Sequence, residues 1–82
     1  MYKNYASDGR RNLCGRKVAA LRKAKVPKLS QRGLADLLQL NGLDVDKNAV
    51  QRIESGQRFV TDIELNALAH VLGVGAEQLL GQ

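Results

Sequence analysis

The stretch from Asp46 to Gly56 constrains the fold most, because both ends of a short helix are marked in it. Asp46 is a favoured N-cap residue, and glycine is the residue that most often follows a helix in the left-handed conformation. Between them, Val50 and Ile53 are three residues apart with Ala49 beside them, so apolar side chains gather on one face. The sequence therefore predicts an amphipathic helix that packs one face against a core.

The opposite face of this predicted helix is polar. It carries the amide and cationic side chains of Lys47, Asn48, Gln51 and Arg52. Side chains of these types hydrogen-bond base edges and phosphates. Such a face has either a nucleic-acid partner or only water around it, and the rest of the chain decides between these interpretations.

Four further short helices are predicted, and no segment has a strand pattern. They cover about residues 12–25, 30–40, 61–72 and 76–80. Pro27 prevents the first from continuing, and Ser30 is a plausible N-cap for the second. Thr61 and Glu64 form a complete capping box at the start of the fourth. The chain is therefore expected to be all-α, with residues 1–11 as a flexible basic arm and residues 12–82 as one domain.

The helical periods also predict which side chains are inside. Cys14 falls on an apolar stripe and is expected to be a small core residue rather than a reactive one. Leu43 and Val45 should anchor the loop before Asp46, and His70 should be a half-buried structural residue. The inner side of the fourth helix should carry Ile63, Leu65, Leu68, Ala69 and Leu72.

Charge is distributed unevenly along the 82 residues, whose net charge is +5. Residues 1–35 carry ten Lys and Arg against one Asp, a balance of +9, and residues 36–82 carry three against seven acidic residues, a balance of −4. This asymmetry favours a basic side that meets an anion, although a basic tail that only aids solubility would give the same counts.

Composition argues against several other functions. One cysteine and one histidine cannot form an internal disulfide or a structural zinc site, and no cofactor motif is visible. No cluster of carboxylates or nucleophile–base pair indicates an enzyme. Because no apolar run approaches the ~20 residues of a membrane span, a cytoplasmic protein without a membrane partner is expected.

Four segments carry a resemblance to a known family. They are Leu21-Arg22-Lys23; Leu29-Ser30-Gln31 with Leu34, Ala35 and Leu38; the run from Val50 to Arg58; and the run from Ile63 to Ala69 with Leu72-Gly73-Val74. In this order and spacing, the chain resembles the lambda-repressor-like (XRE, Cro-type) helix-turn-helix family over about residues 13–81. The resemblance implies a compact five-helix DNA-binding domain with the helix-turn-helix at helices two and three.

The resemblance also implies roles for particular residues. Those expected to read bases in the major groove are Lys47, Asn48, Gln51 and Arg52, with Arg52 suited to guanine and Asn48 to adenine. Those expected to contact phosphates are Gln31, Arg32, Arg58 and Lys28. Lys28 and its neighbour Lys25 could equally be solvated loop residues. Arg22 and Glu54 match a structural pair that joins helix one to helix three, although each could instead lie in water.

One departure from the family pattern concerns the motif itself. The segment between Ser30 and Gly56 is about five residues longer than usual, and the extra residues fall at 40–44. The turn is therefore a loop, as in a longer-turn variant, and the sequence does not predict the angle of helix three in the groove.

We expect sequence-specific binding of double-stranded DNA by a transcriptional regulator, most simply a repressor. A homodimer on a near-palindromic operator would supply enough base contacts for specificity. The alternative is a protein-interaction module, such as an antitoxin or a partner-regulated protein. Its surface would be the apolar C-terminal end, with Leu72, Val74, Leu79 and Leu80, for which ordinary core packing is the preferred interpretation.

Overall fold

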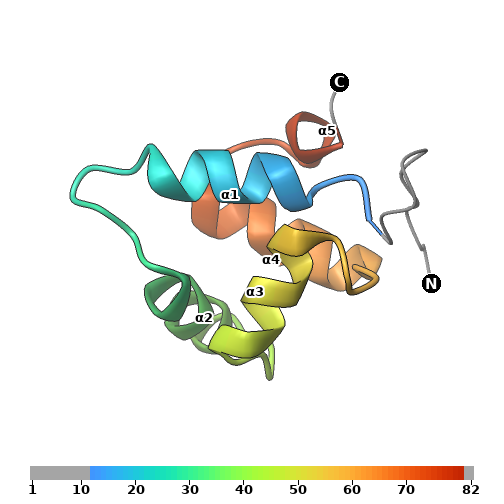
Figure 1. Cartoon of the computed structure of the whole chain (residues 1–82), viewed down its shortest axis with the longest axis horizontal. Coiled ribbons are helices and arrows are strands. Elements are labelled where there is room, and N and C mark those ends of the chain that lie inside the picture. Colours follow the sequence, from blue (N-terminus) through green and yellow to red (C-terminus); the bar gives the residue numbers. More distant parts are fainter. Residues whose placement is uncertain (1–11, 81–82) are drawn as a thin grey trace.

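A computed structural model describes residues 12–80, and these fold into five α-helices (Figure 1). The helices are α1 (Gly15–Lys23), α2 (Gln31–Leu40), α3 (Lys47–Ser55), α4 (Asp62–Leu72) and α5 (Ala76–Leu79). The predicted all-α, five-helix class is confirmed. The basic arm predicted over residues 1–11 lies outside the described residues.

Side-chain caps begin three of these helices at the predicted positions. The side chains of Ser30, Asp46 and Thr61 each accept a hydrogen bond from a backbone amide three residues later. At the start of α4, the Glu64 carboxylate also accepts from the Thr61 amide, which completes the predicted capping box. Gly56 ends α3 with a φ of 81°, a left-handed conformation that favours glycine.

The start of α1 differs from the prediction, since the helix begins at Gly15 and not at Asn12. The Asn12 side chain is outside the helix and accepts a hydrogen bond from the Gly15 amide at 2.7 Å. Its Nδ2 donates to the carbonyls of Ile53 and Arg58 at 3.1 and 2.7 Å. Asn12 is fully buried, and it holds the start of α1 against the end of α3.

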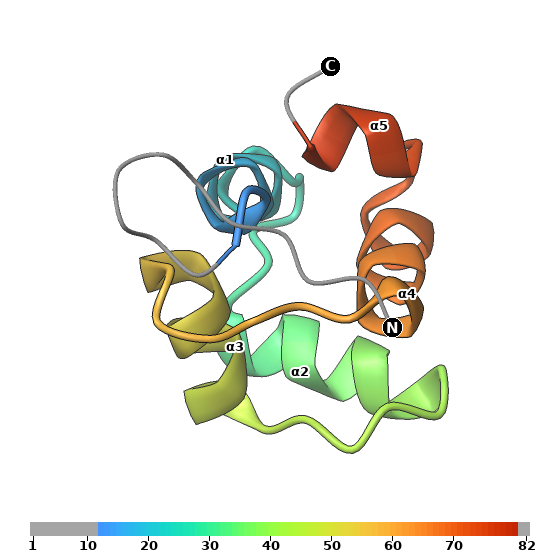
Figure 2. The same ribbon diagram turned by 90° about the vertical axis from the view of Figure 1, so that its right-hand side faces the viewer.

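All five helices surround one apolar core. Figure 2 shows α1 end-on, with α3 and α4 on opposite sides of the core and α2 below it. Its buried members are Cys14, Val18, Leu34, Ala35, Leu38, Val45, Ala49, Val50, Ile53, Val60, Leu65, Leu68, Ala69, Leu72 and Leu79. The predicted inner face of α3, the buried Cys14 and the two loop anchors Leu43 and Val45 all contribute to this packing.

Two predictions about α4 are wrong. Ile63 was expected in the core, but 72% of its surface is exposed. His70 was expected to be half-buried and is exposed. The buried stripe of α4 repeats every three or four residues from Leu65 to Leu72, and Ile63 is two residues, about 200° of helical rotation, before it. His70 is likewise two residues from Leu68 and Leu72, so it faces solvent.

Candidate nucleic-acid interface

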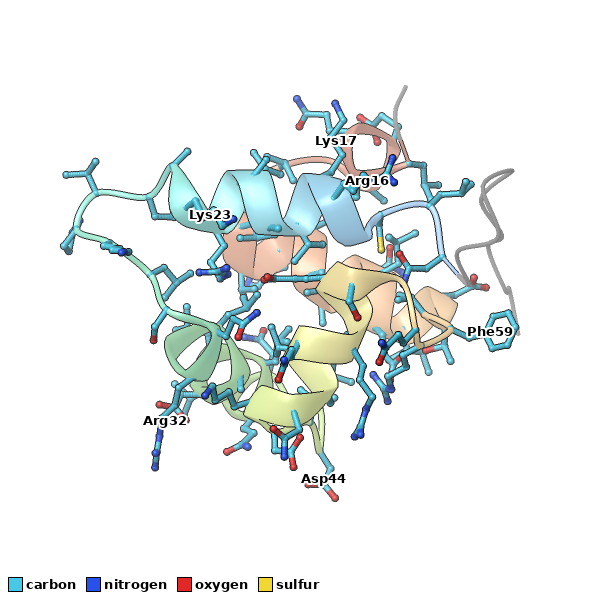
Figure 3. The ribbon with its side chains drawn as sticks, viewed as in Figure 1. Arg16, Lys17, Lys23, Arg32, Asp44 and Phe59 are labelled. Atoms are coloured by element: carbon cyan, nitrogen blue, oxygen red, sulfur yellow. The ribbon has the colours of Figure 1, made fainter. Side chains whose placement is uncertain are left out.

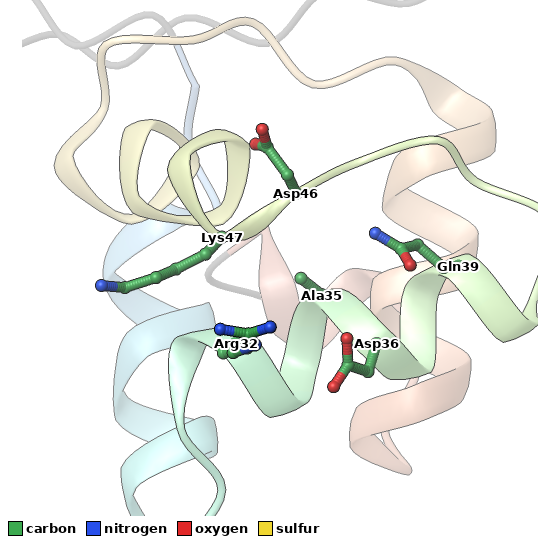
Figure 4. Close-up of a pocket in the computed structure, with 6 residues that line it drawn as sticks. All are labelled: Arg32, Ala35, Asp36, Gln39, Asp46 and Lys47. Carbon is green, nitrogen blue, oxygen red and sulfur yellow. The ribbon is translucent and has the colours of Figure 1, made fainter.

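Two surface clefts lie where the N-terminal ends of α2 and α3 approach each other. The first, the α2–α3 cleft, is lined by Arg32, Ala35, Asp36, Gln39, Asp46 and Lys47. The second, the basic cleft, is lined by Arg22, Lys28, Ser30, Gln31, Arg32 and Lys47. Figure 4 shows Arg32 and Lys47 at one end of the α2–α3 cleft and Gln39 at the other. The fold thus brings the starts of two helices to one surface.

The basic cleft suits an anion. The first turn of α2 carries no acidic residue, and a helix N-terminus presents amide groups and a partial positive charge. Three exposed cations, Lys28, Arg32 and Lys47, line the basic cleft beside it. A phosphate group in this cleft would meet the helix end and the cations together.

The outer face of α3 is as polar as the sequence indicates. Its four candidate base readers, Lys47, Asn48, Gln51 and Arg52, are all exposed. Ala49, Val50 and Ile53 are buried on the other side of the same helix. The four side chains lie in two i, i+4 pairs and therefore share one face. Their role in reading bases stays a prediction.

A buried ion pair links α1 to α3. Arg22 donates to Glu54 twice, from Nε to Oε2 at 2.7 Å and from Nη2 to Oε1 at 3.0 Å. Only 8% of each side chain is exposed. The hydrogen bond to Glu54 raises the pKa of the Arg22 guanidinium above its ordinary value, although burial acts in the opposite direction. The structure thus contains the pair that the family resemblance implied.

The same network reaches α2. Nη1 of Arg22 donates to the Leu29 carbonyl at 3.1 Å, and Nε2 of Gln31 donates to Oε1 of Glu54 at 3.0 Å. Gln31 was predicted to contact a phosphate, and it is half-buried at the edge of the basic cleft. Because the side-chain amide of Gln31 already donates to Glu54, Gln31 would have to make a phosphate contact in addition to this structural bond.

Arg58 is placed differently from the other predicted phosphate contacts. Its Nη2 forms an ion pair with Oε2 of Glu64 at 2.9 Å, and 32% of its side chain is exposed. It lines neither of the two clefts. Arg58 therefore bridges the end of α3 and the start of α4, and any phosphate it meets would lie apart from the one at α2.

The two lysines near Pro27 have different surroundings. Lys28 is exposed and lines the basic cleft, which is compatible with a phosphate contact. Lys25 instead donates from Nζ to the Leu72 carbonyl at 2.9 Å. It thus satisfies a carbonyl at the C-terminal end of α4, where a cation is favoured.

Sequence reasoning missed two residues that organise this region. Asn12 fixes the end of α3 to α1, and its only signal was an amide side chain just before a helix. Gln39 donates from Nε2 to the Val45 carbonyl at 2.8 Å and so bonds the loop before α3 to α2. Nothing in the local sequence pattern around Gln39 indicated this contact.

The described residues offer little to other site types. From Asn12 to Leu80, His, Cys, Asp and Glu nowhere gather in a group of three or more that could hold a metal ion. In the same range, no helix is long and apolar enough to cross a membrane.

One comparison with known proteins gives a match. A family model described as a helix-turn-helix domain matches residues 14–80, which is most of the chain. No curated protein and no solved structure matches it significantly.

Proposed function

This chain belongs to the helix-turn-helix domain family, and we propose that it is a lambda-repressor-like transcriptional repressor that reads the major groove of double-stranded DNA with α3. Membership itself indicates DNA binding and transcription regulation. Repression, the groove contacts and the operator form are the parts that this proposal adds.

One observation carries the proposal. The exposed face of α3, with its amide and cationic side chains, begins beside a basic cleft at the start of α2. In a helix-turn-helix, the helix before the reading helix crosses the DNA backbone. The cations at the start of α2 would hold a phosphate while α3 lies in the adjacent groove.

The charge of the two helices supports a division of roles. The α3 segment carries Lys47, Arg52 and Glu54, and its N-cap is Asp46, so these four charges cancel. Phosphate attraction would then come mainly from the basic cleft. The α3 side chains would supply specificity, with Arg52 on guanine and Asn48 on adenine.

The proposal includes a homodimer on DNA. One reading helix of nine residues contacts too few base pairs to select a single site. Two copies related by a two-fold axis would read half-sites about one helical turn apart, which gives a near-palindromic operator. Under this proposal the protein acts in the cytoplasm, bound to the nucleoid when it occupies its operator.

The interaction-module alternative receives less support. Its proposed surface was the apolar C-terminal end, but Leu72 and Leu79 are buried, and Val74 and Leu80 pack against the core. These side chains are used inside the domain and are not displayed for a partner.

The test is a selection of bound sequences from random DNA, followed by titration of the selected operator. Arg52→Ala and Asn48→Ala should each weaken operator binding by ~1–3 kcal/mol and relax the preference at one base position. Lys17→Ala is the control, since Figure 3 shows Lys17 beside α5, on the other side of α1 from Arg32. Parent-like operator binding by both α3 variants would refute the assignment of base readers.

A further inference from the structure

We propose that Gln39 is a positioning residue that fixes the N-terminal end of α3 and thereby sets which bases the domain prefers. This inference rests on the proposed function, because it concerns how α3 enters the groove. Gln39 is assigned no contact with DNA. It acts through the loop that joins α2 to α3.

The contact path from α2 to α3 is short and continuous. Nε2 of Gln39 donates to the Val45 carbonyl at 2.8 Å. Val45 is 4% exposed and belongs to the core. Its side chain is therefore held by packing, and its carbonyl is held by Gln39. The next residue, Asp46, accepts from the Ala49 amide at 2.8 Å and starts α3. Gln39 therefore holds the residue from which α3 begins.

The loop that this bond supports covers residues 41–46, between α2 and α3. After α2 the backbone turns at Gly42, whose φ of 87° favours glycine, and the Leu43 amide donates to the Leu38 carbonyl at 3.1 Å. From there the chain must still reach Asp46. The Gln39 bond and the burial of Val45 fix this last part of the path.

The two ends of α3 are held by different groups. At the C-terminal end, Glu54 bonds Arg22 and Gln31 in a buried network. At the N-terminal end, the Gln39 bond holds the Val45 carbonyl. Loss of that bond would let α3 pivot about Glu54, so Lys47 and Asn48 would move more than Arg52.

A pivot of α3 about Glu54 predicts that base preference changes at some positions of the operator and not at others. Base positions selected by the start of α3 should lose preference, whereas positions selected by Arg52 should keep theirs. A residue that only stabilised the fold would lower the melting temperature and leave the relative base preferences unchanged. The pattern of preferences is thus the decisive measurement.

The experiment uses the full chain with two nearly isosteric variants, Gln39→Met and Gln39→Glu. Both lack a donor for the Val45 carbonyl, but they differ in charge. Asn41→Ala is the matched control, because Nδ2 of Asn41 makes a similar bond at 2.9 Å to the Leu37 carbonyl, within the end of α2. Each protein is titrated with the operator selected by the parent, with its single-base variants and with unrelated DNA.

Both Gln39 variants should lower the ratio of operator to unrelated-DNA affinity by about fivefold, which corresponds to one hydrogen bond. The loss should concentrate at the positions read by Lys47 and Asn48, and Asn41→Ala should keep the parental ratio. Parental base preferences in both variants would overturn the inference while leaving the proposed function intact. A parent chain that selects no sequence would overturn both.

Discussion

The N-terminal ends of α2 and α4 share a hydroxyl cap, Ser30 in one and Thr61 in the other, but their charges differ. The first turn of α4 contains Asp62 and Glu64, and Glu64 returns a bond to the cap. The first turn of α2 contains no acidic residue. Helix α4 thus neutralises its own positive end, whereas α2 leaves its positive end for a group outside the helix.

The third position of each helix explains the difference. Glu64 occupies it in α4, and Gly33 occupies it in α2. A Cβ atom at Gly33 would lie 3.0 Å from Cδ1 of Leu29 and 3.3 Å from Oγ of Ser30, so Leu29 would have to shift. The first turn of α2 thus carries no carboxylate of its own, and the carboxylate that reaches its Gln31 side chain is Glu54 from α3.

The largest predicted effect comes from removing the carboxylate that accepts a hydrogen bond at the start of each helix, Glu54 at α2 and Glu64 at α4. Glu54 reaches the start of α2 from α3, and Glu54→Ala would leave Arg22 buried without its partner. The free energy of unfolding should fall by about 3 kcal/mol. Glu64→Ala, which removes a more exposed pair and one cap bond, should cost about 1–2 kcal/mol. Urea titrations measure both, and equal losses would contradict the contrast between the two ends.

A second prediction makes α2 resemble α4. Gly33→Glu would place a carboxylate beside the basic cleft. The affinity of this variant for all DNA sequences should fall by about tenfold. The salt dependence should also become shallower, by a log–log slope of about 0.9, if one phosphate contact is lost.

Gly33→Gln is the matched control for this change, since it meets Leu29 equally closely but carries no charge. It should bind DNA with the parental salt dependence. If the Gln and Glu variants bind with the same salt slope, the start of α2 does not contact a phosphate.

The smallest predicted effect separates stability from binding. Thr61→Ala and Ser30→Ala each remove one hydroxyl cap and should each lower the free energy of unfolding by about 1 kcal/mol. Only Ser30→Ala should also weaken DNA binding, because Ser30 lines the basic cleft. Thermal melts measure the stability of both variants, and DNA titrations measure their binding. An equal binding defect in Thr61→Ala would contradict the claim that only the start of α2 contacts DNA.

Local signals predicted most of the fold. Ser30, Asp46 and Thr61 each begin a helix through a bond to an amide three residues away, so a short window of sequence contains the whole interaction. Ile63 shows where this approach fails, because it fits an apolar window yet lies off the buried stripe of α4.

The site was less predictable, because its organising bonds either join distant residues or cross a loop. Gln39 bonds the backbone of a loop, Lys25 bonds the end of α4, and Asn12 bonds the end of α3. A side chain that bonds a remote carbonyl has no partner in its own sequence window, and its partner is set by tertiary packing. The family resemblance supplied candidates for DNA contact but not the residues that position α3.

The buried Asn12 side chain also bears on the order in which the protein is completed during synthesis. Its partners, the Ile53 and Arg58 carbonyls, lie 41 and 46 residues further along the chain. Translation adds about 5–20 residues per second, so these partners are made on the order of seconds after Asn12. The bond from the Gly15 amide to Asn12 is local and can form at once, whereas the two bonds that fasten Asn12 to the end of α3 must wait until that segment has been made.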